Sequence, residues 1–434
     1  MDWFSFIKPK FIEPQMQFGR YSDSFKTDRQ MEFWNEATSK FEQGDYLHSY
    51  EAFFHYLQDD EENNVSFEFL DNHIVFEIQQ GSRVITGKAT KESIAAETDV
   101  AKFNKLDVVV MRKLLEFNYS LKYSRYSITP DNKINLRFES STIDGSPEKL
   151  YNALREVATH SDKQDDLLIS QFNQLRTINN KHVRQLSDAE KEIKQRYIQV
   201  WINRAFNLIA QLDSNQYAQI ISQILLNVAF KIDYLCVPQG NLMGEIEEIQ
   251  SIYFAPNGLA LTEKNAQIIA KLEGILNTDK DLVFNELYYS KATFGVTRPT
   301  LHDVVSQFID NESPRTSYIK NQQQYQIQLN IQEYIIQYIL YYFGINQPSQ
   351  WLMHLMLQVI NYDFFSELGY KPQLYNAVEE KLNKRTIKFK LEQLITEAQN
   401  RYQNFNFDAN AIAYDSIPIF IETMFKQLSQ ISYD

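Results

Sequence analysis

The fold is decided by residues 65–78, VSFEFLDNHIVFEI. Apolar residues take every second position on both sides of Asp71-Asn72, a pair that is typical of turns. These apolar residues are Val65, Phe67, Phe69, Ile74, Phe76 and Ile78. Successive side chains of a strand point to opposite faces of its sheet. The stretch therefore predicts a hairpin whose two strands present one apolar face.

Further strands are expected on the C-terminal side of this hairpin. The turn residues Gln80-Gly81-Ser82 separate it from a third strand, and residues 129–133 separate the two strands of a second hairpin. The additional strands are expected at 84–88, 93–98, 123–128 and 134–140. Together with residues 65–78 they predict an antiparallel sheet with one apolar face.

Three helices are predicted around this sheet. Residues 41–58 and 107–121 repeat apolar side chains at helical spacing. A third helix begins after Ser146, a suitable N-cap that is followed by Pro147 at the first helical position. The predicted order is therefore α-β-β-β-α-β-β-α, with residues 93–98 suited to extending the sheet.

The chain beyond residue 175 shows helical spacing and no convincing pair of strands. Only 12 of the 434 residues are glycine, about 3% against an ordinary usage of about 7%, which favours helices. The expected helices are 187–212, 217–236, 263–277, 281–289, 301–309, 329–343, 351–365, 374–382, 387–403 and 417–429, with 325–329 also suited to a short strand. We therefore expect an α+β N-terminal domain followed by an all-α C-terminal region. The expected boundaries are an arm at 1–40, the α+β domain at 41–175 and the helical domain at 180–434.

Charge and glycine content exclude several classes of function. The net charge is −13, whereas proteins that bind nucleic acids need clustered Lys and Arg. The nearest basic run, Lys381–Lys390, is more typical of a solvated helix face. Neither Gly-x-Gly-x-x-Gly nor Gly-Lys-Ser/Thr occurs in the sequence. We expect no nucleic-acid partner and no cofactor.

Cysteine usage and hydropathy bear on the compartment. Cys236 is the single cysteine, so the chain forms no internal disulfide and no thiolate-rich zinc site, and its apolar surroundings predict a buried, inert thiol. Residues 1–14 lack the apolar core of a secretory signal. The most apolar stretch, Tyr334–Ile345, is well short of the roughly 20 residues that a spanning helix needs. We expect a cytoplasmic protein without a membrane span.

Three segments of the predicted α+β domain carry a family resemblance. They are KLDVVVMRKLLEFN at 105–118, RYSI at 125–128 and INLRF at 134–138. The first resembles the central helix of the class I type III secretion chaperones and the related YbjN-like domains, and the other two resemble the hairpin that follows it. The resemblance covers residues 41–170 and rests on element order and apolar pattern.

The resemblance implies a protein that binds proteins. Chaperones of this kind are acidic and usually dimeric, and they hold an extended segment of a client, so we expect a protein partner or client, with a homodimer as one arrangement. The sheet would capture the segment by its edge or its face. The candidate partner-binding residues are Phe117, Tyr119, Tyr123, Tyr126 and Phe138. Aromatic side chains are favoured interface anchors, although packing within the sheet explains the tyrosines as well.

The sequence assigns no catalytic or metal-binding residue. A His-Glu-x-x-His pair is absent, and the adjacent acids in Glu245-Ile246-Glu247-Glu248 are typical of a polar surface. His354 is expected to be partly buried and hydrogen-bonded. We therefore expect a non-enzymatic protein-binding or chaperone-like adaptor. Two alternatives stay open: an enzyme of unrecognised type with its site where the two domains meet, and a structural subunit of a larger assembly.

Overall fold

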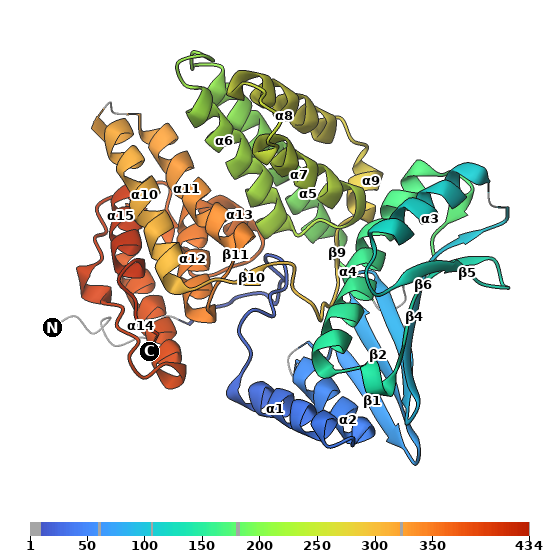
Figure 1. Ribbon diagram of the computed structural model, residues 1–434. Coiled ribbons are helices and arrows are strands. Elements are labelled where there is room, and N and C mark those ends of the chain that lie inside the picture. Colours follow the sequence, from blue (N-terminus) through green and yellow to red (C-terminus); the bar gives the residue numbers. More distant parts are fainter. Residues whose placement is uncertain (1–9, 60–61, 106, 179–182, 322–323, 434) are drawn as a thin grey trace.

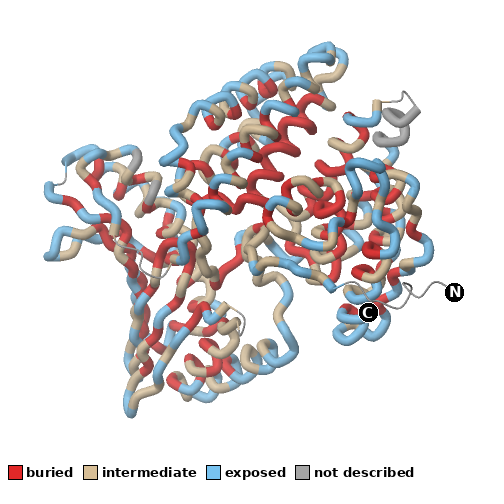
Figure 2. Tube along the Cα trace, turned by 180° about the vertical axis from the view of Figure 1, so that it is seen from behind, coloured by how far each residue is buried: buried red, intermediate tan, exposed pale blue. Residues whose placement is uncertain are grey.

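The expected division into an α+β region and a helical region is confirmed in the computed structural model (Figure 1). The structure describes residues 10–59, 62–105, 107–178, 183–321 and 324–433. Most of residues 1–14, for which no signal was expected, lies outside this range. Two separate clusters of buried apolar residues form the cores, one in each region (Figure 2).

The sheet has the predicted antiparallel hairpins and a longer meander. Its strands are β1 (Val65–Leu70), β2 (His73–Gln80), β3 (Arg83–Thr90), β4 (Ser93–Phe103), β5 (Arg125–Ile128) and β6 (Lys133–Ser141), with the two-residue β7 (Leu175–Arg176) paired to β4. Their order is β1-β2-β3-β4-β6-β5. In the first hairpin Phe67 pairs with Phe76. The quoted stretch thus forms the predicted hairpin, and residues 93–98 do extend the sheet.

Helices cover one face of this sheet and leave the other to solvent. Helix α2 (Tyr46–Leu57) lies over β1–β3, and α4 (Pro147–Gln171) lies over β2, β3, β4 and β6. The covered face buries Ile74, Phe76 and Ile78, which are at most 3% exposed. The opposite face carries exposed Glu77, Thr86, Lys88, Glu97 and Arg137. The apolar side of the predicted alternation is therefore used entirely for the core.

The boundary between the expected arm at 1–40 and the expected helix at 41–58 was wrong. Helix α1 (Asp28–Glu42) begins inside the expected arm, because Thr27 and Gln30 form a reciprocal capping box. The chain then breaks at Gly44, whose φ of +78° lies in the left-handed region that glycine favours. Helix α1 packs against α2, so only residues 10–27 form the described part of the arm.

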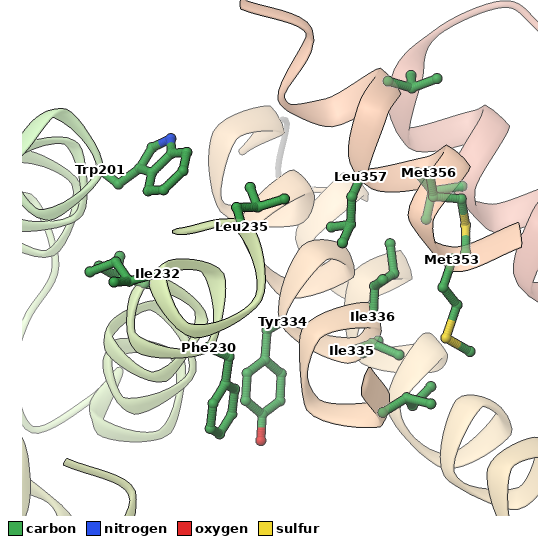
Figure 3. Packing of buried hydrophobic residues seen from close by; sticks show 14 of the residues in the cluster. Trp201, Phe230, Ile232, Leu235, Tyr334, Ile335, Ile336, Met353, Met356 and Leu357 are labelled. Carbon is green, nitrogen blue, oxygen red and sulfur yellow. The ribbon is translucent and has the colours of Figure 1, made fainter. Parts of the chain in front are cut away.

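The second region is a bundle of helices. They are α5 (Asp188–Ile209), α6 (Ala218–Lys231), α7 (Gly240–Phe254), α8 (Leu261–Leu276), α9 (Lys280–Asn285), α10 (His302–Asn321), α11 (Tyr325–Tyr342), α12 (Gln347–Ile360), α13 (Tyr362–Glu367), α14 (Lys384–Arg401) and α15 (Ile417–Leu428). Phe230 of α6 packs on Tyr334 of α11, with ring centroids 6.4 Å apart (Figure 3). Every helix in the described ranges is too short or too polar to cross a bilayer.

Several expectations for this bundle were wrong in detail. Residues 374–382 form a hairpin of β12 (Tyr375–Asn376) and β13 (Lys381–Leu382) instead of a helix. Residues 325–329 are the first turn of α11 instead of a strand, because burial of Ile327 and Ile331 follows helical spacing. Helix α7 was not expected at all. Further two-residue strands pair β8 (Arg184–Gln185) with β9 (Tyr288–Tyr289) and β10 (Arg298–Pro299) with β11 (Phe343–Gly344).

The two regions exchange segments. Phe11, Met16 and Phe18 of the arm pack on the helical core. In return, Phe294 from the loop between β9 and β10 is 1% exposed within the core of the α+β region. The Gln80 side chain fixes this loop by accepting hydrogen bonds from the backbone N–H groups of Thr293 and Phe294, at 3.1 and 3.0 Å. The two regions are therefore joined at two places, by the arm on the helical core and by the Phe294 loop in the α+β core.

His354 lies where the arm meets the bundle, and it is partly buried and hydrogen-bonded as expected. Its Nδ1 lies 3.2 Å from the Tyr234 hydroxyl and its Nε2 lies 3.1 Å from Gln358 Nε2. The Phe18 ring is 4.8 Å away between centroids. Burial, assisted by the charge of Lys390, lowers the pKa of His354 to about 3. The imidazole is therefore neutral in the folded protein at neutral pH.

We predict that His354 destabilises the protein in mild acid. Below the ordinary histidine pKa of about 6.5, the imidazole is protonated in the unfolded state but stays neutral in the folded state. The free energy of unfolding therefore falls as the pH falls toward 3. Relative to His354→Gln, the wild type should lose about 2 kcal/mol of unfolding free energy between pH 7 and pH 5. Urea denaturation at both pH values measures this difference. Equal losses in the two proteins would contradict the buried neutral imidazole.

Candidate functional site

Helix α3 (Val108–Ser120) exposes an apolar face. Asp107 caps its N-terminus by accepting hydrogen bonds from Val109 N and Val110 N, each at 2.9 Å. The helix packs on the sheet region through the buried Val110 and Leu114. Five other apolar side chains of the helix are exposed: Val108 is 61% exposed, Val109 60%, Met111 47%, Leu115 66% and Tyr119 95%. We call these five residues the α3 face.

The five predicted partner-binding residues lie in different environments. Phe138 is 2% exposed and Tyr126 is 6% exposed, so both belong to the core and leave a partner no surface. Phe117 and Tyr123 are partly buried, and the Phe117 ring packs on Tyr126 at 5.6 Å between centroids. Tyr119 alone of the five is fully exposed. Tyr126 and Phe138 are buried because strand alternation points their side chains to the covered face of the sheet.

The open face of the sheet and its β5 edge offer little to an apolar client. Its open face is polar, and the outer edge of β5 is blocked because the Asn118 side chain pairs with both backbone groups of Tyr126. Tyr126 N donates to Asn118 Oδ1 at 2.6 Å, and Asn118 Nδ2 donates to the Tyr126 carbonyl at 3.2 Å. Neither the open face nor the β5 edge therefore presents a suitable surface for capturing an apolar client segment. Of the exposed α3 residues only Tyr119 was among the predicted partner-binding residues. The other four were missed because the apolar residues of this helix were expected to gather near one face, whereas the structure buries some of them and exposes the rest.

A pocket of about 540 Å³ lies between the α+β and helical regions. Its walls come from the arm, the β2–β3 turn, the end of α3, helices α4 and α7, the segment after α6 and the loop before β10. Ligand sites prefer such domain interfaces and have volumes of about 300–1,000 Å³. We call this space the interdomain pocket.

A chain of ion pairs crosses the interdomain pocket. Arg20 of the arm binds Asp233 with Nη2 2.6 Å from Oδ1, and its Nη1 donates to Glu247 Oε1 at 2.8 Å. Glu247 of α7 in turn accepts from Lys163 of α4 at 2.6 Å. Burial raises the pKa of Asp233 in spite of Arg20. Burial also acts to raise the pKa of Glu247, but the two cations outweigh it and the pKa is lowered. The chain therefore joins the arm to both regions.

The backbone beside Asp233 is strained. Helix α6 ends in a π-helical turn, η3 (Ile232–Cys236), which is followed by Val237 at φ +50°. A left-handed conformation is a true outlier for a β-branched residue, and π-turns are frequent at functional sites. Val237 lines the interdomain pocket. Cys236 is buried, as predicted, and burial raises the pKa of its thiol to about 12.

His160 brings an imidazole to the same pocket. Its Nδ1 lies 3.0 Å from the Tyr126 hydroxyl, and burial lowers the pKa of His160. One turn earlier, the Glu156 carboxylate accepts from the backbone N–H groups of Lys122, Tyr123 and Ser124 at 2.8–2.9 Å and from the Ser124 hydroxyl at 2.7 Å. Glu156 thus holds the turn after α3, whereas His160 lies at the pocket wall, hydrogen-bonded to Tyr126 and with a pKa that burial lowers.

The sequence could not reveal this pocket, because its residues come from segments up to 279 positions apart. Glu247 was interpreted as ordinary polar surface within its acidic run, although it is one-fifth exposed and paired with two cations. Within the described part of the chain, no three His, Cys, Asp or Glu side chains gather in a way that could hold a metal ion. The chain matches no protein-family model, and a search of curated proteins found no match.

We predict that Arg20 is needed because it neutralises a buried carboxylate. Arg20→Met leaves Asp233 without its cation and should cost about 3–5 kcal/mol of unfolding free energy. The double variant Arg20→Met/Asp233→Asn should recover part of this loss, because the buried charge is removed as well. Lys163→Met is the control, since Lys163 is half exposed and should cost about 1 kcal/mol or less. Urea denaturation of an Arg20→Met protein as stable as the wild type would refute this account.

Proposed function

We propose that this protein binds a partner protein through the α3 face. The observation that carries the proposal is the exposure of five apolar side chains on one helix of 13 residues. Contiguous apolar surface on a soluble protein commonly marks an interaction site. Val108, Met111, Leu115 and Tyr119 follow one another at intervals of three or four residues, so they form a stripe along the helix.

The charge around the α3 face indicates what kind of segment fits it. Lys105, Arg112, Lys113 and Lys122 lie on or beside the helix, against Asp107 and Glu116. This surplus of positive charge stands out on a chain of net charge −13. The proposed partner is therefore an amphipathic protein segment whose apolar side chains are flanked by Asp and Glu. The resemblance of residues 41–170 to secretion chaperones and YbjN-like domains is consistent with an adaptor role of this kind.

An enzyme is the second candidate function. The observation in its favour is the interdomain pocket, where His160 and carboxylates from distant parts of the sequence gather. His160 has the geometry of an acid–base group, since its ring is oriented by Tyr126 and its pKa is lowered by burial. Turnover of a metabolite that His160→Gln abolishes would establish this function.

We predict that a photocrosslinker on α3 captures one partner. Tyr119→p-benzoylphenylalanine should give a single adduct in cells, and the crosslinked peptide should carry apolar residues flanked by acids. The same group at Val378, which is also 95% exposed, should give no such adduct. Adding Leu115→Glu should lower the yield at least about tenfold, because a charge would be buried at the contact. Val378→Glu should leave it unchanged.

Three results would contradict the proposal. They are the absence of an adduct, adducts of equal yield from positions 119 and 378, and a yield that Leu115→Glu does not change. An adduct with a second copy of this chain would make α3 a homodimer contact in place of a client site. Sedimentation of the protein with phosphatidylserine vesicles would indicate a membrane surface.

A further inference from the structure

We propose that the interdomain pocket binds a small organic cation, an ammonium or guanidinium group carried on an apolar body. This inference is independent of partner binding at the α3 face, and it requires no catalysis. The pocket has the volume of a small-molecule site and lies between two regions that are held together by exchanged segments. Its wall includes the strained Val237, a conformation that persists only where the surrounding structure enforces it.

The ionisable groups of the wall favour a positive ligand. Four carboxylates line the pocket, from Glu156, Asp162, Asp233 and Glu247, against the two cations Arg20 and Lys163. Both cations are already bound to carboxylates, Arg20 to two of them and Lys163 to one. The neutral His160 adds no positive charge. The net charge of the chain, −13, also attracts cations into such a cleft.

Glu247 is the group best placed to receive the ligand. Each of its carboxylate oxygens accepts one hydrogen bond, from Arg20 and from Lys163, at 2.8 and 2.6 Å. An ionised carboxylate offers about four acceptor positions, so both oxygens retain capacity for a further donor. Its side chain is 21% exposed, which leaves it accessible from the pocket. Glu156 differs because four donors already surround its oxygens.

The rest of the wall suits the apolar body of the ligand. Leu121, Met243 and Val296 line the pocket, together with the aromatic residue Tyr21. An aromatic ring attracts cations through its face, in addition to the contact area that it supplies. An anionic ligand would have to displace Glu247 or Asp233 from Arg20 or Lys163, since these are the two cations of the wall. The combination of carboxylates, an aromatic ring and aliphatic side chains therefore selects a cation.

Three phenyl compounds of similar size and different charge test this assignment: phenethylamine, 2-phenylethanol and 3-phenylpropanoate. Isothermal titration calorimetry on the full chain measures their binding. Phenethylamine should bind at least tenfold more tightly than the other two. Glu247→Gln should weaken phenethylamine binding at least tenfold. Glu245→Gln is the matched control on the same helix, because Glu245 also pairs with a lysine, Lys271, but lies outside this pocket.

A second variant keeps the test decisive if Glu247→Gln does not fold. Met243→Trp adds volume at the pocket wall without changing charge, and it should abolish binding while circular dichroism shows a folded protein. The inference is overturned if phenethylamine does not bind, if the carboxylate probe binds as well as the amine, or if neither variant weakens binding. Crosslinking from Tyr119 is unaffected by these variants, so failure here is distinct from failure of the proposed partner site.

Discussion

The ion pair between the partly buried guanidinium of Arg20 and the buried carboxylate of Asp233 is the constraint on which the rest of the arrangement depends. Asp233 lies in a buried π-turn, and a buried carboxylate without a cation is strongly destabilising. The arm is therefore held against the helical bundle, where Gly19 N donates to the Tyr234 carbonyl at 2.8 Å. Glu247 extends the same ion-pair chain to Lys163 of the α+β region. One side chain from the arm thus fixes where the two regions meet.

A second connection joins the two regions: the loop between β9 and β10 places Phe294 in the α+β core. Both segments are fixed by hydrogen bonds where they border the interdomain pocket, at Gly19 and at Thr293 and Phe294. Helix α3 is common to both proposed sites: its outer side is the α3 face, and its end reaches the pocket at Ser120 and Leu121. The two proposed sites are therefore an apolar surface for a protein and a charged pocket for a small molecule.

Local pattern predicted the sheet well, because the alternation in residues 65–78 depends only on which side of each strand is buried. Local pattern failed where tertiary contacts determine the local structure. Gly44 separates α1 from α2 within a stretch of continuous helical spacing, and residues 374–382 turn into a hairpin. Tyr119 was the one residue of the α3 face among the predicted partner-binding residues. The other four were missed because apolar residues at helical spacing are expected to be buried, and their exposure depends on how the helix packs. No local signal could place Arg20 beside Asp233, 213 residues away.

We expect the arm and the Phe294 loop to fold as one body with the two cores. Amide hydrogen exchange, resolved by residue, tests it most directly at Gly19, Thr293 and Phe294, whose N–H groups donate to Tyr234 and Gln80. The account predicts that these amides exchange as slowly as those of β2 and α6, because they open only when a core opens. Fast exchange at these three amides, with β2 and α6 still protected, would contradict it.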